Sequence, residues 1–112
     1  MDRGSSRVKL ELSDKAYADL LEIWVYNAEY YTIEHADKYW AFVFTELERV
    51  VDHPLLVGRP VENFPHLRCV IIKRRAGGHG HAAYYEIHPD AIRVVRILHT
   101  SMYAPDHLDP AE

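Results

Sequence analysis

The fold of this chain is decided by the stretch AIRVVRILH, residues 91–99. Its branched and leucine side chains occupy both odd and even positions, so an extended chain presents apolar groups on both faces. A strand of this kind belongs inside a sheet. Two arginines, Arg93 and Arg96, interrupt the apolar pattern. Because they lie three positions apart, an extended chain sends them to opposite faces, where one reaches solvent and the other needs a partner or a wet, concave surface.

Two amphipathic helices are predicted upstream of this strand. Before them, Arg7 to Leu12 alternates charged and apolar residues, which predicts a half-buried strand. Ser13 is a suitable N-cap for the first helix and Thr32 for the second, which ends at His53-Pro54. So short a link between them predicts an antiparallel helical hairpin. The apolar stripes are Tyr17, Leu20, Leu21, Trp24 and Ala28 in the first helix, and Ile33, Ala36, Trp40, Val43, Leu47 and Val50 in the second.

The second half of the chain completes the predicted sheet. Pro54 to His66 is a predicted loop, because Gly58-Arg59-Pro60 and Phe64-Pro65 interrupt regular structure. The element order is β-α-α-β-β-β, an α+β fold whose antiparallel sheet is packed on one face by the helical hairpin. The tail, Met102 to Leu108, is predicted to run along the sheet edge. The last three strands form a meander at Leu67–Arg74, His81–Ile87 and Ala91–His99, with turns at Ala76–Gly80 and His88–Asp90.

Length and composition fit one globular domain. The chain has 112 residues, of which 48% are hydrophobic and 27% charged. We expect a single domain over residues 1–112, with flexible ends at 1–6 and 109–112. No apolar run is long enough to cross a bilayer and no targeting segment is recognised, so no membrane partner and a cytoplasmic location are expected. The single cysteine, Cys69, allows no internal disulfide.

The net charge of −4 is unevenly distributed. Between residues 68 and 96, basic side chains outnumber acidic ones by six to two. Such a region can steer an acidic partner toward one face, although most basic runs are only solvated surface. The six basic residues are Arg68, Lys73, Arg74, Arg75, Arg93 and Arg96.

Aromatic side chains gather on the two predicted helices. Such rings could form a platform on which nucleic-acid bases stack. Their helical spacing favours the other interpretation, which is packing between the helices. The residues concerned are Tyr26, Tyr30, Tyr31, Tyr39, Trp40 and Phe42.

No complete catalytic motif is present in the sequence. His79-Gly80-His81 could offer two imidazoles to a metal, but no carboxylate or cysteine stands nearby, so no metal site and no cofactor are predicted. His99 and Ser101 lack the glycines of a nucleophile elbow. A metal-free ribonuclease is an open hypothesis, because His81, His88 or His99 could act as acid or base near neutral pH. By default the sequence favours a binding protein over an enzyme.

Four pieces of the sequence, taken with the predicted element order, resemble a known family. They are Gly58-Arg59-Pro60, Leu67-Arg68, Tyr84-Tyr85 and, most specifically, Val94-Val95-Arg96-Ile97-Leu98-His99. From about Val8 to Leu108 the chain resembles the ParE branch of the RelE/ParE toxins of bacterial type II toxin–antitoxin modules. The resemblance implies a toxin neutralised by a ParD-like antitoxin. It also implies that the toxin inhibits DNA gyrase, whereas RelE-like members cut messenger RNA on the ribosome.

The two branches differ at two positions that the resemblance identifies. RelE-like toxins carry an arginine just ahead of the aromatic of the third strand and another just past the fourth. This chain has Ala82 and Thr100 there. Since both cations would stabilise the phosphate during cleavage, their loss favours the ParE reading. The alternative is a RelE-like ribosome-dependent endoribonuclease using Lys73, His81 and Tyr103, and a third possibility is an inactive relative that still binds an antitoxin.

The resemblance and the basic strands together suggest two contact surfaces. An antitoxin helix or strand is expected along the helical hairpin and the sheet edge, at Tyr17, Leu20, Leu21, Trp24 and Trp40. The predicted surface for gyrase is Arg68, Arg74, Arg93, Arg96, His99 and Tyr103. Arg96 has a structural alternative, in which its guanidinium holds the tail. Sequence-specific DNA binding by the chain alone is not expected.

Overall fold

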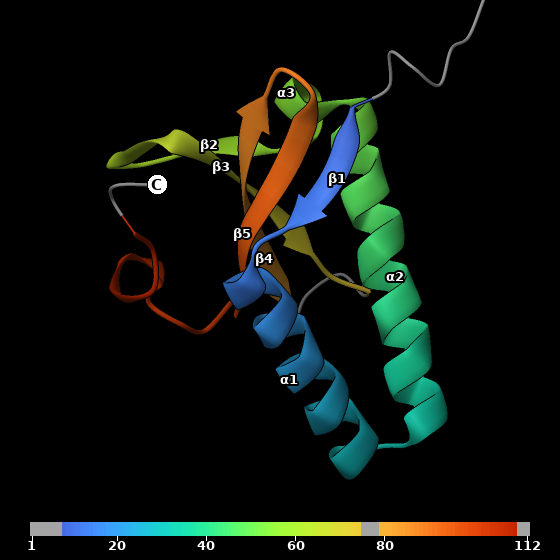
Figure 1. Ribbon diagram of the computed structural model, residues 1–112. Coiled ribbons are helices and arrows are strands. Elements are labelled where there is room, and N and C mark those ends of the chain that lie inside the picture. Colours follow the sequence, from blue (N-terminus) through green and yellow to red (C-terminus); the bar gives the residue numbers. More distant parts are fainter. Residues whose placement is uncertain (1–7, 75–78, 110–112) are drawn as a thin grey trace, which may run out of the picture.

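The sheet is built around β5 (Ala91–His99), which lies between β1 (Lys9–Leu12) and β4 (His81–His88). The computed structural model describes residues 8–74 and 79–109. Next to β4 follow β3 (Phe64–Ile72) and the short β2 (Arg59–Val61), so the order across the sheet is β1-β5-β4-β3-β2 (Figure 1). The inner position of β5 confirms the expectation from its two apolar faces.

One edge of the sheet differs from the predicted antiparallel arrangement. β1 pairs with β5 in parallel, with Leu10 opposite Ile92, while the other neighbouring strands are antiparallel. A tight turn forces two strands to be antiparallel, but β1 and β5 are joined through the rest of the fold. The direction of β1 is therefore free to match that of β5, and the expectation is wrong at this edge.

The predicted loop at residues 54–66 contains regular structure. It holds the short helix α3 (Pro54–Val57), the strand β2 and the first residues of β3. Pro60 is tolerated because β2 is an edge strand, and the backbone groups on its outer edge have no neighbouring strand to bond. Pro65 lies in β3 before the pairing with β4 begins at Arg68. The prolines thus mark an edge of the sheet and do not exclude strands.

The two predicted helices and their caps are confirmed. α1 (Asp14–Tyr30) and α2 (Ile33–Asp52) form an antiparallel hairpin that packs on one face of the sheet (Figure 1). The Ser13 hydroxyl accepts a hydrogen bond from the Ala16 amide at 3.0 Å, and the Thr32 hydroxyl accepts one from the His35 amide at 2.9 Å. Each cap satisfies a backbone donor that the first helical turn cannot bond internally.

The core between the hairpin and the sheet is aliphatic with two central aromatic rings. Ile92, Val94 and Ile97 of β5 enter it together with residues spaced along both helices. Its fully buried centre consists of Leu20, Val43, Leu47, Val50, Ile72, Tyr85, Ile92 and Val94, and Tyr39 closes one end.

The tail covers the opposite face of the sheet. After β5 the chain forms the 3-10 turn η2 (Ala104–Asp106), and Leu108 is buried in a second apolar cluster. The expectation that the tail runs along the sheet edge is therefore wrong, since the apolar residues of this face also need a cover. The other buried members are Phe64, Leu67, Ala82, Tyr84, Val95 and Leu98.

A β-bulge in β5 changes the direction of its arginines. Arg93 lies opposite Glu86 and Arg96 lies opposite Tyr84, and the register shifts between Tyr84 and Tyr85. Glu86 and Tyr84 are alternate residues of β4 and belong to one face. Both arginines therefore lie on the same side of the sheet, and the expected opposite directions are wrong because the bulge adds one residue to β5.

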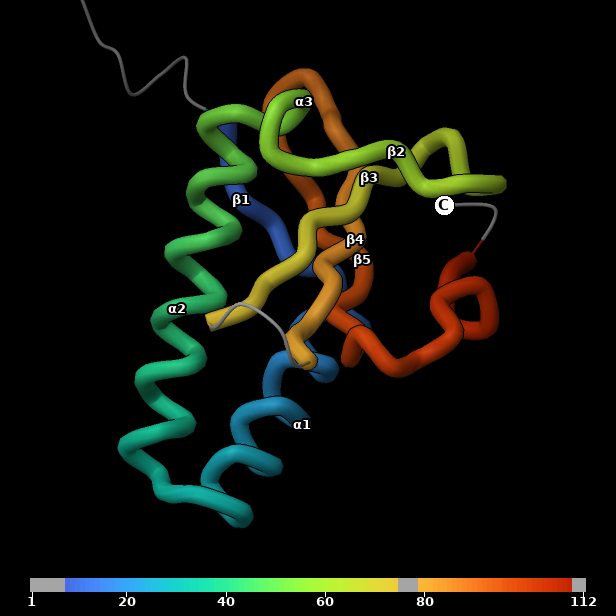
Figure 2. Tube along the Cα trace, turned by 180° about the vertical axis from the view of Figure 1, so that it is seen from behind, coloured from blue at the N-terminus to red at the C-terminus, as the bar shows by residue number. Residues whose placement is uncertain are grey.

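The far half of the hairpin projects beyond the sheet. In both views the ends of α1 and α2 extend well past the ends of β4 and β5 (Figures 1 and 2). Neither helix, nor any other in the described ranges, is long and apolar enough to span a membrane. The predicted flexible ends, apart from Asp109, and residues 76–78 of the predicted glycine turn lie outside the described residues.

Candidate functional site

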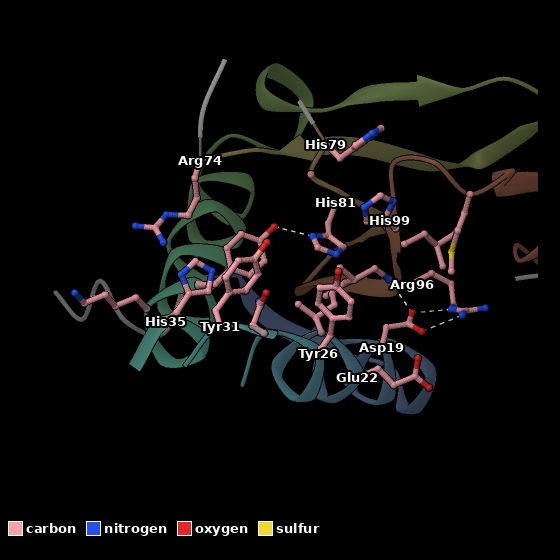
Figure 3. A pocket seen from close by; sticks show the side chains of 18 of the residues that line it. Asp19, Glu22, Tyr26, Tyr31, His35, Arg74, His79, His81, Arg96 and His99 are labelled. Carbon is pink, nitrogen blue, oxygen red and sulfur yellow. Dashed lines mark hydrogen bonds and ion pairs between the residues drawn. The ribbon is translucent and has the colours of Figure 1, made fainter. Parts of the chain in front are cut away.

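A cleft opens where the projecting hairpin leaves the sheet. Its volume is about 1290 Å³, and it is bounded by α1, α2, the end of β3, the start of β4, the end of β5 and the tail (Figure 3). The helices are longer than the strands that they cover, so their far halves face this space in place of a sheet. The side chains around the cleft are mainly polar and aromatic.

Histidines from both central strands meet at the cleft. His81 of β4 lies directly opposite His99 of β5, and their ring centroids are 5.5 Å apart. His79 packs on His99 with a centroid distance of 5.3 Å. The third histidine considered as an acid or base, His88, lies at the other end of β4, where its Nε2 is 2.8 Å from the Glu86 carboxylate. The structure therefore brings two of the three together.

His81 is held neutral by its surroundings. Its Nδ1 lies 2.7 Å from the Tyr39 hydroxyl, which reaches it from α2 (Figure 3). Burial, helped by the neighbouring His99, lowers the pKa of His81 to about 4. Burial also raises the pKa of Tyr39 to about 12, against a smaller opposing effect of Arg74. At neutral pH the pair is an uncharged hydrogen bond between imidazole and phenol.

The ring of His99 is fixed by Ser101. The Ser101 backbone amide donates to His99 Nδ1 at 3.1 Å, and the Ser101 hydroxyl lies 2.6 Å from the same nitrogen. Because a backbone amide can only donate, this nitrogen carries no proton in the arrangement. A neutral His99 therefore carries its proton on Nε2, where it can be donated to a ligand.

Arg96 and Asp19 form the opposite wall of the cleft (Figure 3). The Arg96 guanidinium donates to the Asp19 carboxylate through Nε at 2.8 Å and Nη2 at 2.9 Å. The hydrogen bond to Asp19 raises the pKa of Arg96, in spite of partial burial. Arg96 Nη1 also donates to the His107 carbonyl at 2.9 Å, which is the tail-holding role that the structural alternative expects. The charge of Arg96 is thus largely neutralised by a partner.

The wall that faces Asp19 and Arg96 across the cleft carries cationic side chains from α2 and from the residues after β3. Arg74 lies over the Phe42 ring, with its guanidinium carbon 5.8 Å from the ring centroid. Lys38 and His35 line the cleft from α2, and the His35 ring packs on Tyr31 at a centroid distance of 4.6 Å. In Figure 3, Arg74, His35 and Tyr31 lie on the side of the cleft away from Asp19. The cleft therefore has one cationic wall and one wall that holds the Asp19–Arg96 pair and the Glu22 carboxylate.

The residues predicted to bind the target do not form one surface. Arg74, Arg96 and His99 line the cleft. Arg68 is used inside the fold, because its Nη2 donates to the Leu55 carbonyl at 3.0 Å and to the Gly58 carbonyl at 2.6 Å. Arg93 lies 4.0 Å from Glu11, and Tyr103 is 69% exposed away from the cleft.

The residues of the ribonuclease alternative do not all line the cleft, although the Lys73 side chain packs beside Gly80, next to His81. His81 lines the cleft, whereas Lys73 and Tyr103 do not. A metal-free cleavage needs its base, acid and cation around one phosphate. Residues 8–74 and 79–109 contain no group of three histidine, cysteine or acidic side chains placed to hold a metal ion.

The predicted antitoxin contacts divide between surface and core. Leu20 is fully buried, so including it in a docking surface is wrong. Tyr17 and Leu21 are 49% and 42% exposed on the outer face of α1. Trp24 and Trp40 are half-buried, and the Trp24 indole donates to Asp37 at 2.9 Å. Val25, 49% exposed and one turn beyond Leu21, extends the same surface and could have been found from its i+4 spacing.

The sequence reasoning missed the contribution of the hairpin to the cleft. No sequence pattern points to His35 and Lys38, and helical spacing predicts that Tyr26 and Tyr31 pack between the helices. Tyr26 and Tyr31 are 54% and 61% exposed, so most of each ring is not consumed by packing. The available signal was their position near the C-terminal end of α1 and just after it. A helix end that extends beyond the sheet cannot bury its inner face on the sheet, so rings at that end stay exposed.

Comparisons with known proteins agree on one family. The family described as the ParE toxin of type II toxin-antitoxin system, parDE, matches residues 10–103. Toxin ParE1 of Caulobacter vibrioides is 34% identical over 97 residues, which cover 87% of this chain and 94% of that protein. A solved structure described as the chromosomal ParDE TA system from P. aeruginosa superposes with a TM-score of 0.70 at 22% identity, covering 83% of this chain and 96% of that chain.

Proposed function

Because the chain belongs to the ParE toxin family of type II toxin–antitoxin systems, we propose that it binds and inhibits DNA gyrase and that a ParD-like antitoxin neutralises it. The family match over residues 10–103 is the observation that carries this proposal. The family match favours gyrase as the target, because gyrase inhibition is what the resemblance to ParE toxins implies. The loss of both RelE-type arginine positions, occupied here by Ala82 and Thr100, adds support, since those cations would stabilise the phosphate during cleavage.

For gyrase we infer a contact surface outside the cleft. Tyr103 is the most exposed member of the predicted set, and an exposed aromatic residue is a common anchor in protein interfaces. Arg93 keeps 44% of its side chain exposed and is only loosely paired with Glu11. By contrast, Arg68 and Arg96 are committed to contacts within the fold. Arg93 and Tyr103 are therefore the residues to test.

The gyrase proposal is tested with purified components. Gyrase, relaxed plasmid and ATP are incubated with increasing toxin, and supercoiled and protein-linked broken DNA are measured. Loss of supercoiling with accumulation of breaks is expected. The Tyr103→Ala and Arg93→Gln variants should require at least tenfold more protein, whereas Arg59→Gln, an exposed arginine on β2, should act as the wild type. Unchanged supercoiling at all concentrations would show that gyrase is not the target, and site-specific transcript cleavage during expression would favour the ribonuclease.

For the antitoxin we infer docking on the outer face of α1. Tyr17, Leu21 and Val25 form an exposed apolar stripe with helical spacing. A shallow depression on this stripe is bordered by Glu22 and Glu29. An amphipathic helix with an apolar face and basic flanks fits both features.

This docking surface predicts a loss of neutralisation. Leu21→Asp should abolish capture by the product of the adjacent antitoxin gene in a pull-down assay, because it places a charge in the apolar contact. Ile87→Asp, a comparably exposed apolar residue on β4, should bind the antitoxin as the wild type does. Equal binding by both variants would assign the antitoxin to another face.

A further inference from the structure

We propose that the cleft beneath the projecting hairpin binds a nucleotide unit, with its base stacked on the tyrosine rings and its phosphate held by the cationic wall. Five of the eight histidines of the chain line this cleft, together with Arg74 and Lys38. No part of the proposed gyrase and antitoxin contacts requires these residues. The proposal does not rest on the proposed function and concerns binding alone, although Tyr26 borders both the cleft and the depression on the antitoxin stripe.

The base-binding part is provided by the inner face of the hairpin. Tyr26 and Tyr31 line the cleft and are more than half exposed, although both lie in the helical layer of the fold. Tyr26 packs on Tyr30 and Tyr31 packs on His35, with centroid distances of 4.5 and 4.6 Å. These partners hold one side of each ring and leave the rest of the ring available. Rings presented in this way bind flat, unpaired bases by stacking, largely independently of base identity.

The phosphate-binding part is provided by cations that are not paired with a carboxylate. Neither Arg74 nor Lys38 lies within 4.0 Å of a carboxylate in the described part of the chain. On the opposite wall, Asp19 is already paired with Arg96, so its repulsion of an anion is largely cancelled, and Glu22 is the remaining carboxylate of the lining. The local field of the cleft is therefore positive on one side, in spite of the net charge of −4.

The floor of the cleft adds polar donors between these two parts. The rings of His79, His81 and His99 pack on one another there. Since His99 Nδ1 accepts from Ser101, its Nε2 is a donor, and Asn27 adds an amide on the helical side. Such groups suit the sugar hydroxyls and base edges of a nucleotide.

Other occupants explain fewer of these features. A purely acidic peptide would use Arg74 and Lys38 but would leave the exposed tyrosines and the imidazole floor without a role. An apolar helix would require a lining made mainly of non-aromatic apolar side chains, and the cleft has four of them, namely Ile23, Ile97, Leu98 and Met102. A nucleotide uses the aromatic, cationic and polar groups together. The same chemistry is offered by a free nucleotide and by a single strand of RNA or DNA.

Fluorescence anisotropy with labelled single strands tests the proposal. The probes are twelve-residue strands of DNA and of 2′-O-methyl RNA, which cannot be cleaved by attack of its 2′ oxygen, and free nucleoside mono- and triphosphates serve as competitors. Saturable binding that weakens with rising salt is expected. Competition by free nucleotides at micromolar to low millimolar concentration identifies a small-molecule site, and its absence with intact strand binding identifies a strand site.

Matched variants place the binding in the cleft. Tyr31→Ala should weaken binding at least fivefold, and Arg74→Gln should weaken it and reduce the salt dependence. Tyr103→Ala and Arg59→Gln remove the same groups from exposed positions outside the cleft and should bind as the wild type does. Circular dichroism and thermal melting check that each variant is folded.

Three results would overturn the proposal. They are the absence of binding to every probe at low salt, equal binding by the cleft and control variants, and equal or tighter binding of a glutamate-rich peptide. The last result would assign the cleft to an acidic protein segment. Since Tyr103→Ala is expected to weaken gyrase inhibition and to leave nucleotide binding unchanged, failure of one proposal is distinguishable from failure of the other.

Discussion

At the scale of single residues, Asp19 joins three distant parts of the chain. Its carboxylate accepts two hydrogen bonds from the Arg96 guanidinium and a third from the Ile97 amide at 2.9 Å. Arg96 in turn holds the His107 carbonyl of the tail. β1 ends opposite Val94, so the edge of β5 beyond this residue has no strand partner. The Asp19 carboxylate supplies the acceptor that the Ile97 amide would otherwise lack.

Replacing Arg96 by lysine should therefore destabilise the fold. Lysine cannot donate through two parallel N–H groups and also reach a third acceptor. The side chains of Arg96 and Asp19 are only 20% and 13% exposed, so solvent does not compensate fully. We expect the free energy of unfolding, measured in urea, to fall by about 1.5–3 kcal/mol. Arg93→Lys is the matched control and should change it by less than about 0.5 kcal/mol, because the Arg93–Glu11 pair is exposed and long.

His81 predicts a dependence of stability on pH. Its pKa is lowered to about 4 in the folded protein, whereas an unfolded chain titrates near 6.5. As the pH falls below about 6.5, His81 binds a proton in the unfolded state but stays neutral in the folded state. The free energy of unfolding therefore decreases between about pH 6.5 and pH 4. His81→Gln should remove about 1 kcal/mol of the loss between pH 7 and pH 5, after allowance for solvent screening.

The control for this prediction is His88→Gln, which removes a histidine that is 46% exposed. Urea unfolding curves of the three proteins at pH 7 and pH 5 provide the measurement. An identical pH dependence for His81→Gln and the wild type would show that the imidazole of His81 titrates normally in the folded protein.

Sequence reasoning at this scale succeeded where interactions are local. Ser13 and Thr32 were predicted as caps because a cap lies three residues from its donor. His81 and His99 were recognised as candidates from their type alone, but their meeting depended on the pairing of β4 with β5. The partner of Arg96 was beyond prediction, because Asp19 is 77 positions away in sequence.

At the scale of elements, Ser13 connects β1 and α1 to the bulge of β5. Its amide donates to the Val94 carbonyl at 2.9 Å, and its hydroxyl donates to the Val95 carbonyl at 2.9 Å. The same hydroxyl accepts from the Ala16 amide. One buried serine thus caps a helix and bonds the carbonyl that the bulge displaces.

Ser13→Ala should cost more stability than the removal of an ordinary cap. It leaves the Ala16 amide and the Val95 carbonyl without their partner, so we expect the free energy of unfolding to fall by about 2–3 kcal/mol. Thr32→Ala removes an exposed cap and should cost about 1 kcal/mol. Chemical denaturation of both variants measures the difference. Equal costs would mean that the bond to the bulge contributes little.

The number of elements was predicted less well than their type. Both helices were predicted because their apolar stripes extend over several turns. α3 and β2 were missed because four and three residues are too few to show a period. The bulge was also missed, since one added residue in a strand with apolar side chains on both faces leaves no recognisable change in the pattern.

At the scale of the whole molecule, the sheet is covered on both faces by different means. The helical hairpin covers one face, and the tail with Leu108 covers the other. The sequence predicted the first cover from helical periodicity. The second was not predicted because the tail is short, polar and interrupted by Pro105, so only its burial in the fold reveals Leu108 as a core residue.

Leu108 should accordingly behave as a core residue in spite of its position in the tail. Leu108→Ala removes a side chain that is 6% exposed, and we expect the free energy of unfolding to fall by about 2–4 kcal/mol. Met102→Ala, at 48% exposure in the same segment, should change it by less than about 0.5 kcal/mol. Thermal melts compare the two. A silent Leu108→Ala variant would mean that the tail does not cover this face in solution.

The order of the strands also has a consequence for how the protein is made. β5 is the inner strand that joins β1 to the rest of the sheet, yet it follows the other four strands along the chain. During translation β1 emerges first and has no neighbour to pair with until residue 94 has been synthesised. The nascent polypeptide consequently cannot complete its sheet early. The native fold is formed only after nearly all of the domain has left the ribosome.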